Sequence, residues 1–257
     1  MSIMSSMNEN RTHAQSTPGT PQASTSGTDS ELVADDAHGE EYDDAQLRAE
    51  IDAELAAERR SKPRAGATLT GAVLLIGGLV GWIAALNLLV DKLYLLSNPG
   101  ATLACDVNPF ISCGTVMMTW QAEAFGIPNM AIGLGGFAIM GVLGALMLSG
   151  TTLPPWMRWA RLGGMTFAFA FVHFLAFSAI FIIRTLCPWC MVVWVATAPM
   201  FFATLAHTVE SGDLRLPGPL AGILRRWVLL TLAWYLLVAL VILIAFWGQW
   251  MATLGIG

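Results

Sequence analysis

The chain has 257 residues, of which 55% are hydrophobic and only 12% are charged, and its mean hydropathy is +0.61. This composition excludes a soluble globular protein, which could not cover so much apolar surface, and it predicts a polytopic helical membrane protein. The net charge of −5 is unevenly divided, because residues 1–64 carry −7 and the rest of the chain carries +2. No basic stripe with interleaved aromatic residues is present, so nucleic acid is not expected as a partner.

Residues 1–64 are expected to form an acidic cytoplasmic tail. The first 45 residues are rich in Ser, Thr, Gly, Asn, Asp and Glu, which predicts disorder because too little apolar surface can be buried. They are not a signal peptide, since no basic start precedes an apolar core. The following stretch, Ala45 to Arg60, contains good helix formers and suits either a juxtamembrane helix or a solvated charged linker.

Five apolar runs are long enough to cross a bilayer as helices. They are Ala67 to Val90, Met130 to Leu148, Leu162 to Ile183, Pro188 to Ala206 and Trp227 to Trp247. Four bases between residues 59 and 64 precede the first run, and this places the N-terminus in the cytoplasm by the positive-inside rule. The resulting topology keeps eleven of the thirteen bases inside, including those of the connector at residues 151–161, and leaves only Lys92 and Arg184 outside.

The fold expected from this pattern is an all-α membrane protein with a four-helix bundle and an extra C-terminal span. Its parts would be the tail at 1–64, a catalytic transmembrane bundle at 65–210, and a cytoplasmic connector with the fifth helix at 211–257. Gly77, Gly81 and the run Gly133–Gly136 are interpreted as sites of close helix packing. His173, alone in the third span, is expected to be packed and neutral rather than a catalytic base.

The chain has four cysteines, and two of them form the motif Cys187-Pro188-Trp189-Cys190 at the start of the fourth span. Proline suits the first position of a helix, and a helix N-terminus stabilises a thiolate. We therefore favour a redox-active pair, with a static disulfide or two packed thiols as the alternative. Arg184, one turn upstream, is expected to be an interfacial anchor.

The other two cysteines, Cys105 and Cys113, lie in the polar loop from Cys105 to Asn129, in which a short helix is expected from Thr115 to Ala124. They could simply staple the loop. With all four cysteines at the outer, oxidising face, two dithiols that exchange electrons through a mixed disulfide are the favoured interpretation. A Cys₄ zinc site is disfavoured, because seven residues separate the loop cysteines whereas structural zinc knuckles are closely spaced.

These motifs resemble those of the vitamin K epoxide reductase family. That family has a C-D-x(6)-C loop pair, a Ser or Thr six residues after its second cysteine, and a later C-x-x-C at the outer end of a membrane helix. The corresponding positions here are Cys105, Asp106, Cys113, Thr119, Cys187 and Cys190. The flanks NP…SCG and FG.PN look like those of bacterial members, and the resemblance covers roughly Ala67 to His207.

The resemblance implies that the bundle surrounds a site for a quinone, menaquinone or ubiquinone, which accepts electrons from the C-x-x-C pair without a metal. It implies that Cys190 faces the quinone and that Thr119 hydrogen-bonds a quinone carbonyl, with Asn129 as a weaker second polar contact. It further implies a transient disulfide between a loop cysteine, Cys113 in first place, and Cys187.

From the residues alone, other roles stay open for three of these positions. Thr119 could be a plain residue on the surface of the loop helix, and Asn129 could cap the second span. Trp194 lies one turn after Cys190 on the same helix face, which suits either the lining of a quinone pocket or core packing.

By resemblance the electron donor is the reduced dithiol of a thioredoxin-fold (DsbA-like) disulfide carrier, soluble or tethered to the membrane. Many bacterial relatives carry a thioredoxin-like domain at the C-terminus, and this sequence shows none, so we expect a separate carrier. The enzyme would lie in the plasma or inner membrane and support disulfide formation outside the cell. Two other functions stay open: reduction of a quinone epoxide, or a non-enzymatic membrane protein with structural disulfides or Cys₄ zinc.

Overall fold

The computed structural model describes residues 46–55, 65–108 and 110–253. A helix covers residues 46–55, within the range in which either a helix or a linker was expected, and it is described on its own because the chain divides into two units near this point. The disorder expected for the first 45 residues lies outside the described residues.

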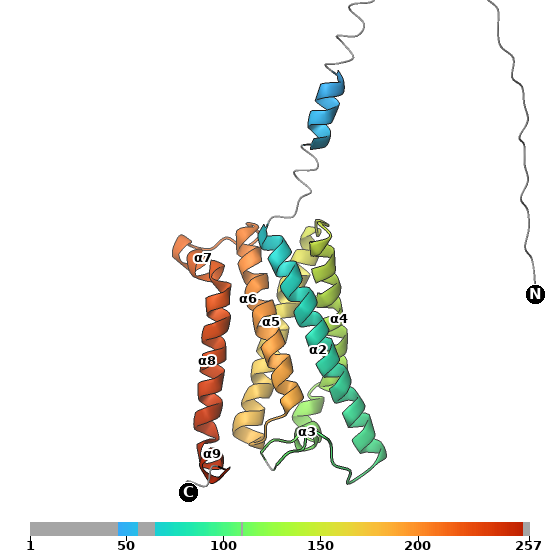
Figure 1. Cartoon of the computed structure of the whole chain (residues 1–257), viewed down its shortest axis with the longest axis vertical. Coiled ribbons are helices and arrows are strands. Elements are labelled where there is room, and N and C mark those ends of the chain that lie inside the picture. Colours follow the sequence, from blue (N-terminus) through green and yellow to red (C-terminus); the bar gives the residue numbers. More distant parts are fainter. Residues whose placement is uncertain (1–45, 56–64, 109, 254–257) are drawn as a thin grey trace, which may run out of the picture. The chain divides into compact units, whose positions relative to one another are not determined.

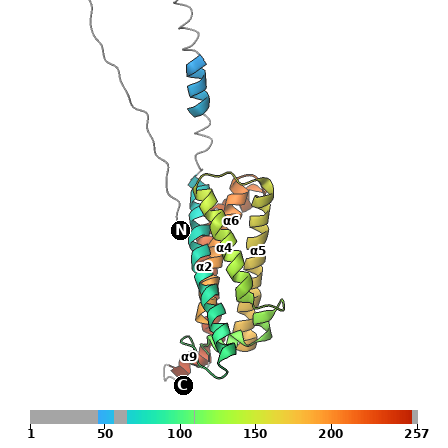
Figure 2. The same ribbon diagram turned by 90° about the vertical axis from the view of Figure 1, so that its right-hand side faces the viewer.

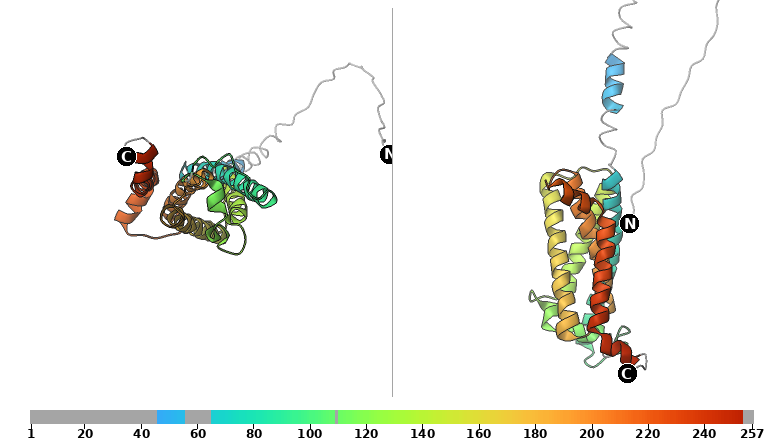
Figure 3. Two further views of the ribbon diagram at one scale, coloured as in Figure 1. Left: turned by 90° about the horizontal axis from the view of Figure 1, so that it is seen from below. Right: turned by 90° about the vertical axis from the view of Figure 1, so that its left-hand side faces the viewer.

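Four long helices form a bundle: α2 (Ala65–Ser97), α4 (Asn129–Leu148), α5 (Pro155–Phe177) and α6 (Pro188–Glu210). Figure 1 shows them side by side, and the end-on view in Figure 3 shows them arranged as a ring. Within the ring α2 packs against both α4 and α6, and α5 packs against α6. Each helix is apolar over most of its length, so the bundle presents an apolar exterior as well as an apolar core.

Five helices among the described residues are long and apolar enough to span a membrane, the fifth being α8 (Trp227–Ala245). This confirms the expected all-α membrane fold with five spans. Two ends differ from the prediction by seven residues each. The first helix continues past Val90 to Ser97, and the third begins at Pro155 rather than at Leu162.

The third helix starts early because its two arginines have partners inside the protein. Arg158 makes a two-pronged ion pair with Asp213, with N···O distances of 2.8 and 2.7 Å. Arg161 is 1% exposed and directs its guanidinium to Met147 Sδ and His207 Nδ1. The expectation that residues 151–161 form a polar connector is therefore wrong beyond Pro154, since tertiary contacts accommodate charges that a sequence pattern assigns to a loop.

Glycines bring α2 and α4 into backbone contact. A Cβ atom on Gly144 would lie 2.6 Å from the backbone nitrogen of Leu75, and one on Gly78 would lie 2.8 Å from the backbone of Gly141. A Cβ atom on Gly133 would make only an ordinary contact with α2, and one on Gly135 or Gly136 would point into open space. Close packing is thus the wrong interpretation for most of the run Gly133–Gly136.

We predict that Gly144→Ala lowers the free energy of unfolding by about 1–3 kcal/mol, because the added methyl group meets backbone atoms that cannot move aside. Gly135→Ala is the matched control in the same helix, and it should be neutral or slightly stabilising because alanine is the better helix former. Equilibrium unfolding in mixed detergent micelles measures both. Equal stability of the two variants would contradict the close approach of α2 and α4.

The C-terminal helices α7 (Gly218–Arg225), α8 and α9 (Trp247–Thr253) follow the bundle. Trp234 of α8 donates its indole N–H to His173 Nε2 over 2.9 Å, and Tyr235 donates to the carbonyl of Val195. Because an indole only donates, His173 carries its hydrogen on Nδ1 and donates it to the carbonyl of Phe169. His173 has an exposed edge on the bundle surface, but its ring packs against Phe169 and Trp234, as expected of a packed histidine, and it joins α5 to α8.

The segment between α2 and α4 closes one end of the bundle (Figure 2). It contains the short helix α3 (Cys113–Met117) and the 3₁₀ turn η1 (Trp120–Glu123). The connection between α5 and α6 at the same end is short, because α5 continues into the π-helical turn η2 (Ser178–Ile183), and α6 begins five residues later. Both cysteine pairs therefore lie at this end of the molecule.

Candidate active site

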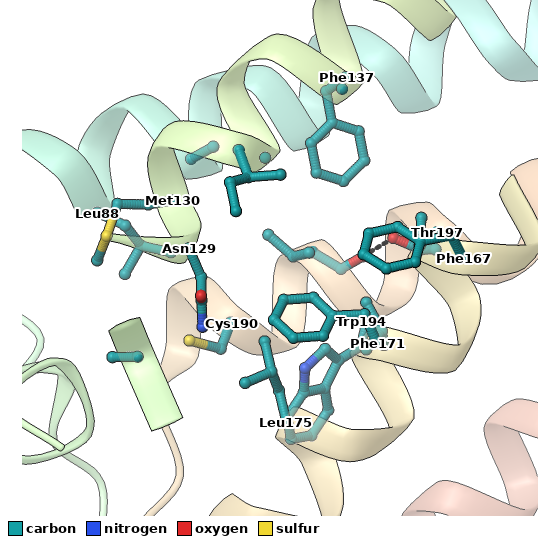
Figure 4. A pocket seen from close by; sticks show the side chains of 18 of the residues that line it. Leu88, Asn129, Met130, Phe137, Phe167, Phe171, Leu175, Cys190, Trp194 and Thr197 are labelled. Carbon is teal, nitrogen blue, oxygen red and sulfur yellow. Dashed lines mark hydrogen bonds between the residues drawn. The ribbon is translucent and has the colours of Figure 1, made fainter. Parts of the chain in front are cut away.

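A cavity of about 430 Å³ lies inside the four-helix ring, next to the end that carries the cysteines. Residues from all four bundle helices line it, together with α3 and η1, and Figure 4 shows its side chains. The lining is apolar apart from a few groups. The hydroxyl, amide and thiol side chains in it are Thr119, Gln121, Asn129, Ser178, Cys187, Cys190 and Thr197. An apolar cavity with few polar groups is the usual form of a small-molecule site.

The C-x-x-C pair forms the first turn of α6. Cys187 is the N-cap residue and Pro188 is the first helical residue, as the motif predicts, because proline has no N–H to lose there. The Sγ atom of Cys187 accepts the backbone N–H of Cys190 at 3.4 Å, and both cysteines are free thiols. In Figure 4 the Cys190 side chain lies near Asn129 at the cavity wall.

The surroundings of Cys187 lower the pKa of its thiol. A hydrogen bond from the Cys190 thiol lowers the pKa of Cys187, and the backbone N–H groups of Cys190 and Trp189 lower it further, although burial acts in the opposite direction. A thiolate is the reactive form in disulfide exchange. The arrangement therefore favours a thiolate at Cys187, and both Cys187 and Cys190 line the cavity.

The loop pair is a disulfide between Cys105 and Cys113, with the two Cα atoms 5.7 Å apart. Cys113 is fully buried at the start of α3, where Ser112 caps the helix by accepting the N–H of Thr115. Cys105 is only partly buried. One sulfur of the disulfide thus lies inside the protein and the other lies near its surface.

A short parallel bridge joins the two cysteine-bearing segments. Ile111 pairs with Leu186: the N–H of Leu186 donates to Phe110, and the N–H of Ser112 donates to Leu186, at 2.9 and 3.0 Å. Cys187 comes directly after Leu186 and Cys113 comes two residues after Ile111, and paired strands lie about 4.8 Å apart. All four cysteines accordingly belong to one packed cluster with Leu88, Met117 and Met130.

Asp106 holds the loop in this conformation. Its carboxylate accepts the N–H groups of Leu103 and Gly114 and the hydroxyl of Ser112, at 2.9, 3.0 and 2.8 Å. Burial raises the pKa of Asp106, but these hydrogen bonds outweigh it and leave the pKa below its ordinary value. The residue next to Cys105 therefore stays ionised and ties Cys105 to the start of α3.

Lys92 is a site residue that the sequence pattern missed. It is 5% exposed, donates to the carbonyl of Met117 at 2.7 Å, and pairs with Glu123 at 3.0 Å. It thus fastens α2 to both α3 and η1, which line the cavity. From the sequence Lys92 was only an exception to the charge asymmetry, although a lysine near the end of an apolar helix is itself a functional signal.

The prediction of one continuous helix from Thr115 to Ala124 is wrong. Helix α3 ends at Met117, whose carbonyl binds Lys92 instead of the N–H of Gln121 that a continuing α-helix would supply. Thr119 lies at the break, lines the cavity, and donates its hydroxyl to the carbonyl of Val116 at 2.8 Å. It is therefore not a residue on the surface of a continuous helix, and its proposed bond to a quinone stays a prediction.

Asn129 also lines the cavity, at the first position of α4. The alternative role as an N-cap is wrong, since Pro128 holds that position and no side chain caps the helix. Asn129 Nδ2 donates to the carbonyl of Gln121 at 2.6 Å, whereas its Oδ1 is buried without a partner. A buried, unpaired oxygen in a cavity wall suits a ligand that carries a hydrogen-bond donor.

Trp194 is 4% exposed and lines the cavity one turn beyond Cys190, so it both packs in the core and contributes to the pocket. Five of the seven residues predicted for the site, Thr119, Asn129, Cys187, Cys190 and Trp194, therefore share this cavity. The remaining two, Cys105 and Cys113, adjoin it through the cysteine cluster. In the described ranges, no three His, Cys, Asp or Glu side chains converge in a manner that would hold a metal ion.

The fold and the site together define a polytopic helical membrane protein in which two cysteine pairs meet beside an apolar cavity. The sequence profile of the vitamin K epoxide reductase family matches residues 72–205, slightly more than half of the chain, and the protein belongs to that family. This classes it with quinone-linked thiol oxidoreductases and epoxide reductases. A comparison with curated protein sequences finds no match.

Proposed function

We propose that the protein is a thiol:quinone oxidoreductase that reoxidises a separate thioredoxin-fold disulfide carrier and thereby supports disulfide formation. One observation carries the proposal: the Ile111–Leu186 bridge brings the loop pair beside a C-x-x-C pair that lines an apolar cavity. A structural staple would need neither the second pair of free thiols nor the cavity beside it.

The burial of the loop cysteines supports an order for the relay. A carrier thiolate attacks Cys105, the accessible sulfur, and releases Cys113 as a thiolate. The second carrier thiol then attacks the carrier sulfur of this mixed disulfide, so that the carrier leaves as a disulfide and Cys105 is released as a thiol. Val107, two residues after Cys105, is 68% exposed and offers the carrier an apolar contact. The buried Cys113 is left facing the C-x-x-C pair.

In the second exchange the Cys113 thiolate attacks Cys187 in the oxidised C-x-x-C pair and releases Cys190. Cys105 then attacks Cys113, which restores the loop disulfide and leaves Cys187 and Cys190 reduced. The structure has these oxidation states, with a disulfide between Cys105 and Cys113 and free thiols at Cys187 and Cys190. Two electrons and two protons from Cys187 and Cys190 convert a quinone to its quinol, and the pair becomes a disulfide again.

The cavity suits a quinone as the electron acceptor. Its apolar walls accept a ring, and the unpaired Asn129 Oδ1 can accept a hydrogen bond from a hydroxyl of the quinol. Ile139 of α4 and Phe167 of α5 line the cavity and are nevertheless 60% and 53% exposed. Residues with both properties mark an opening, so an isoprenoid tail would leave between α4 and α5 into the lipid.

The charge distribution supports a cytoplasmic N-terminus and an extracytoplasmic active site in the plasma or inner membrane. Arg158 and Asp213 pair at the end of the bundle where α5 begins and α6 has ended. The cysteines lie at the opposite end, where α5 passes into η2 and α6 begins. An oxidising compartment at that end is where a dithiol relay would operate.

Thiol trapping tests the proposal. The purified, fully reduced protein is treated with a menaquinone or ubiquinone analogue, and free thiols are counted with an alkylating reagent before and after a reduced thioredoxin-fold carrier is added. We expect four thiols to disappear with quinone and the carrier to become oxidised catalytically. Thiols that stay free with quinone present would refute the function. Turnover only with a quinone epoxide would favour the reductase alternative.

A further inference from the structure

Arg184 has an unusual backbone conformation close to the dithiol. It lies three residues before Cys187 and is the one non-glycine residue of the described chain with a positive φ, at φ 60° and ψ 32°. It ends the π-helical turn η2. A left-handed conformation is unfavourable for a residue with a Cβ atom, and π-helical turns and such residues persist where surrounding contacts hold them.

The backbone N–H of Arg184 donates to the carbonyl of Ala179, and its side chain is held by the C-terminal helix. Its Nη1 donates to the carbonyl of Ala245, the last residue of α8, at 3.2 Å. The last carbonyls of a helix lack intrahelical partners and carry partial negative charge, so a guanidinium suits them. The guanidinium is therefore engaged with α8, and no hydrogen bond joins it to Cys187 among those found in the described residues.

Phe246, the next residue, fixes the same end of α8 by packing. It is 2% exposed and belongs to a cluster with Ile180 of η2 and Leu186, against which Cys190 also packs. On its other side Leu186 is held by the backbone bonds to Phe110 and Ser112. The four residues from Arg184 to Cys187 thus lie between the outer loop and the end of the C-terminal helix.

We propose that the end of α8 is a positioning element of the dithiol, and that Arg184 and Phe246 hold residues 184–187 in the conformation in which Cys187 caps α6. The inference rests on the proposed role of Cys187 and Cys190 as the reacting pair. It assigns a purpose to the fifth span, which lies beside the four-helix ring and contributes no side chain to the cavity lining (Figure 3).

A chemical consequence follows from the cap. The backbone N–H groups at the start of α6 stabilise the Cys187 thiolate only while Cys187 stays at the N-cap position. A stabilised thiolate also favours the reduced pair over the disulfide. Loosening of residues 184–187 should therefore raise the pH at which the thiolate forms and shift the dithiol–disulfide equilibrium toward the disulfide.

The test uses the full chain in detergent with its loop disulfide intact, so that only Cys187 and Cys190 titrate. Thiolate formation is followed by ultraviolet absorbance as a function of pH, and Cys187→Ser serves as the blank. This measurement works for a buried thiol and needs neither quinone nor carrier. Arg184→Gly permits the left-handed backbone but removes the guanidinium. We expect its thiolate midpoint to rise by about one unit, a tenfold loss of thiolate at a given pH, whereas Arg184→Lys should stay near the parent.

Phe246→Ala separates positioning from charge, since it leaves Arg184 in place and should still raise the midpoint. In glutathione buffers, Arg184→Gly and Phe246→Ala should favour the disulfide by about tenfold, which corresponds to ~30 mV for a two-electron couple. Arg225→Ala, an exposed arginine at the end of α7, is the control and should change neither quantity.

Unchanged titrations in folded Arg184→Gly and Phe246→Ala would overturn the inference. A shift in Arg184→Gly alone, with Phe246→Ala at the parent value, would also overturn it and would point to the arginine charge. If Arg184→Gly does not fold, Phe246→Leu and Arg184→Gln provide the same comparison with smaller changes. A failure of quinone reduction in the parent protein would refute the proposed function and would leave these titrations as they are.

Discussion

Replacement of Cys190 by serine is expected to lower quinone-coupled thiol oxidation by at least about a thousandfold. It should also let a Cys113–Cys187 disulfide accumulate, because the Cys187 thiolate attacks Cys113 in the loop disulfide, releases Cys105, and has no Cys190 to displace it. Without Cys190 no thiolate remains at the cavity wall, and Cys187 loses its partner in the C-x-x-C disulfide. The parallel bridge keeps Cys113 beside it. The activity is measured as oxidation of a reduced carrier with quinone, and the disulfide is identified by mass spectrometry of a non-reducing digest.

Cys105→Ser provides the matched experiment on the other pair. Cys105 is the thiol that would release Cys113 from Cys187, so its loss should also accumulate the Cys113–Cys187 disulfide, this time with Cys190 free. Cys113→Ser should abolish that disulfide in either background. If Cys190→Ser instead accumulates a Cys105–Cys187 disulfide, the accessible loop cysteine, rather than the buried one, reaches the C-x-x-C pair. The order of the relay would then have to be reversed.

Asn129→Leu is expected to lower kcat/KM for the quinone by about 10- to 30-fold, which corresponds to ~1.5–2 kcal/mol. The substitution keeps the approximate size of the side chain but removes Asn129 Oδ1, which with Ser178 Oγ is one of two unpaired buried oxygens found in the cavity wall of the described chain. Asn129→Leu also removes the hydrogen bond from Nδ2 to the carbonyl of Gln121. A second cavity variant is therefore needed to attribute the loss of activity to the quinone contact.

Thr119→Val is that second variant, and its effect should be smaller than that of Asn129→Leu. The Thr119 hydroxyl already donates to the carbonyl of Val116, and it must give up that bond before it can donate to a quinone. Thr119→Ser should retain the parent activity. A larger loss in Thr119→Val than in Asn129→Leu would reverse this ranking and would identify the threonine hydroxyl as the main polar contact, as the resemblance to the family implies.

Local patterns were sufficient for the membrane fold and for the chemistry of the C-x-x-C pair. An apolar run of about 20 residues needs no partner to identify it as a span, because its length and composition alone match the bilayer. The position of Cys187 as the N-cap of α6 could also be predicted from Pro188, because a helix start depends on a few consecutive residues. The loop pair was recognisable from its spacing, but its position relative to the second pair was not.

Only the tertiary structure decided how these parts meet. The bridge between Ile111 and Leu186 joins segments 75 residues apart in the chain, and no local pattern encodes such a contact. Lys92 ends α3 at Met117, and Arg184 donates to the end of α8, since each charge found its partner on a distant element. The sequence by itself determined the five spans and the helix start at Cys187, because both depend on neighbours along the chain. The fold decided which sulfur is accessible, how the two cysteine pairs meet, and which polar atoms of the cavity wall stay unpaired, because burial and pairing depend on residues brought together from four helices.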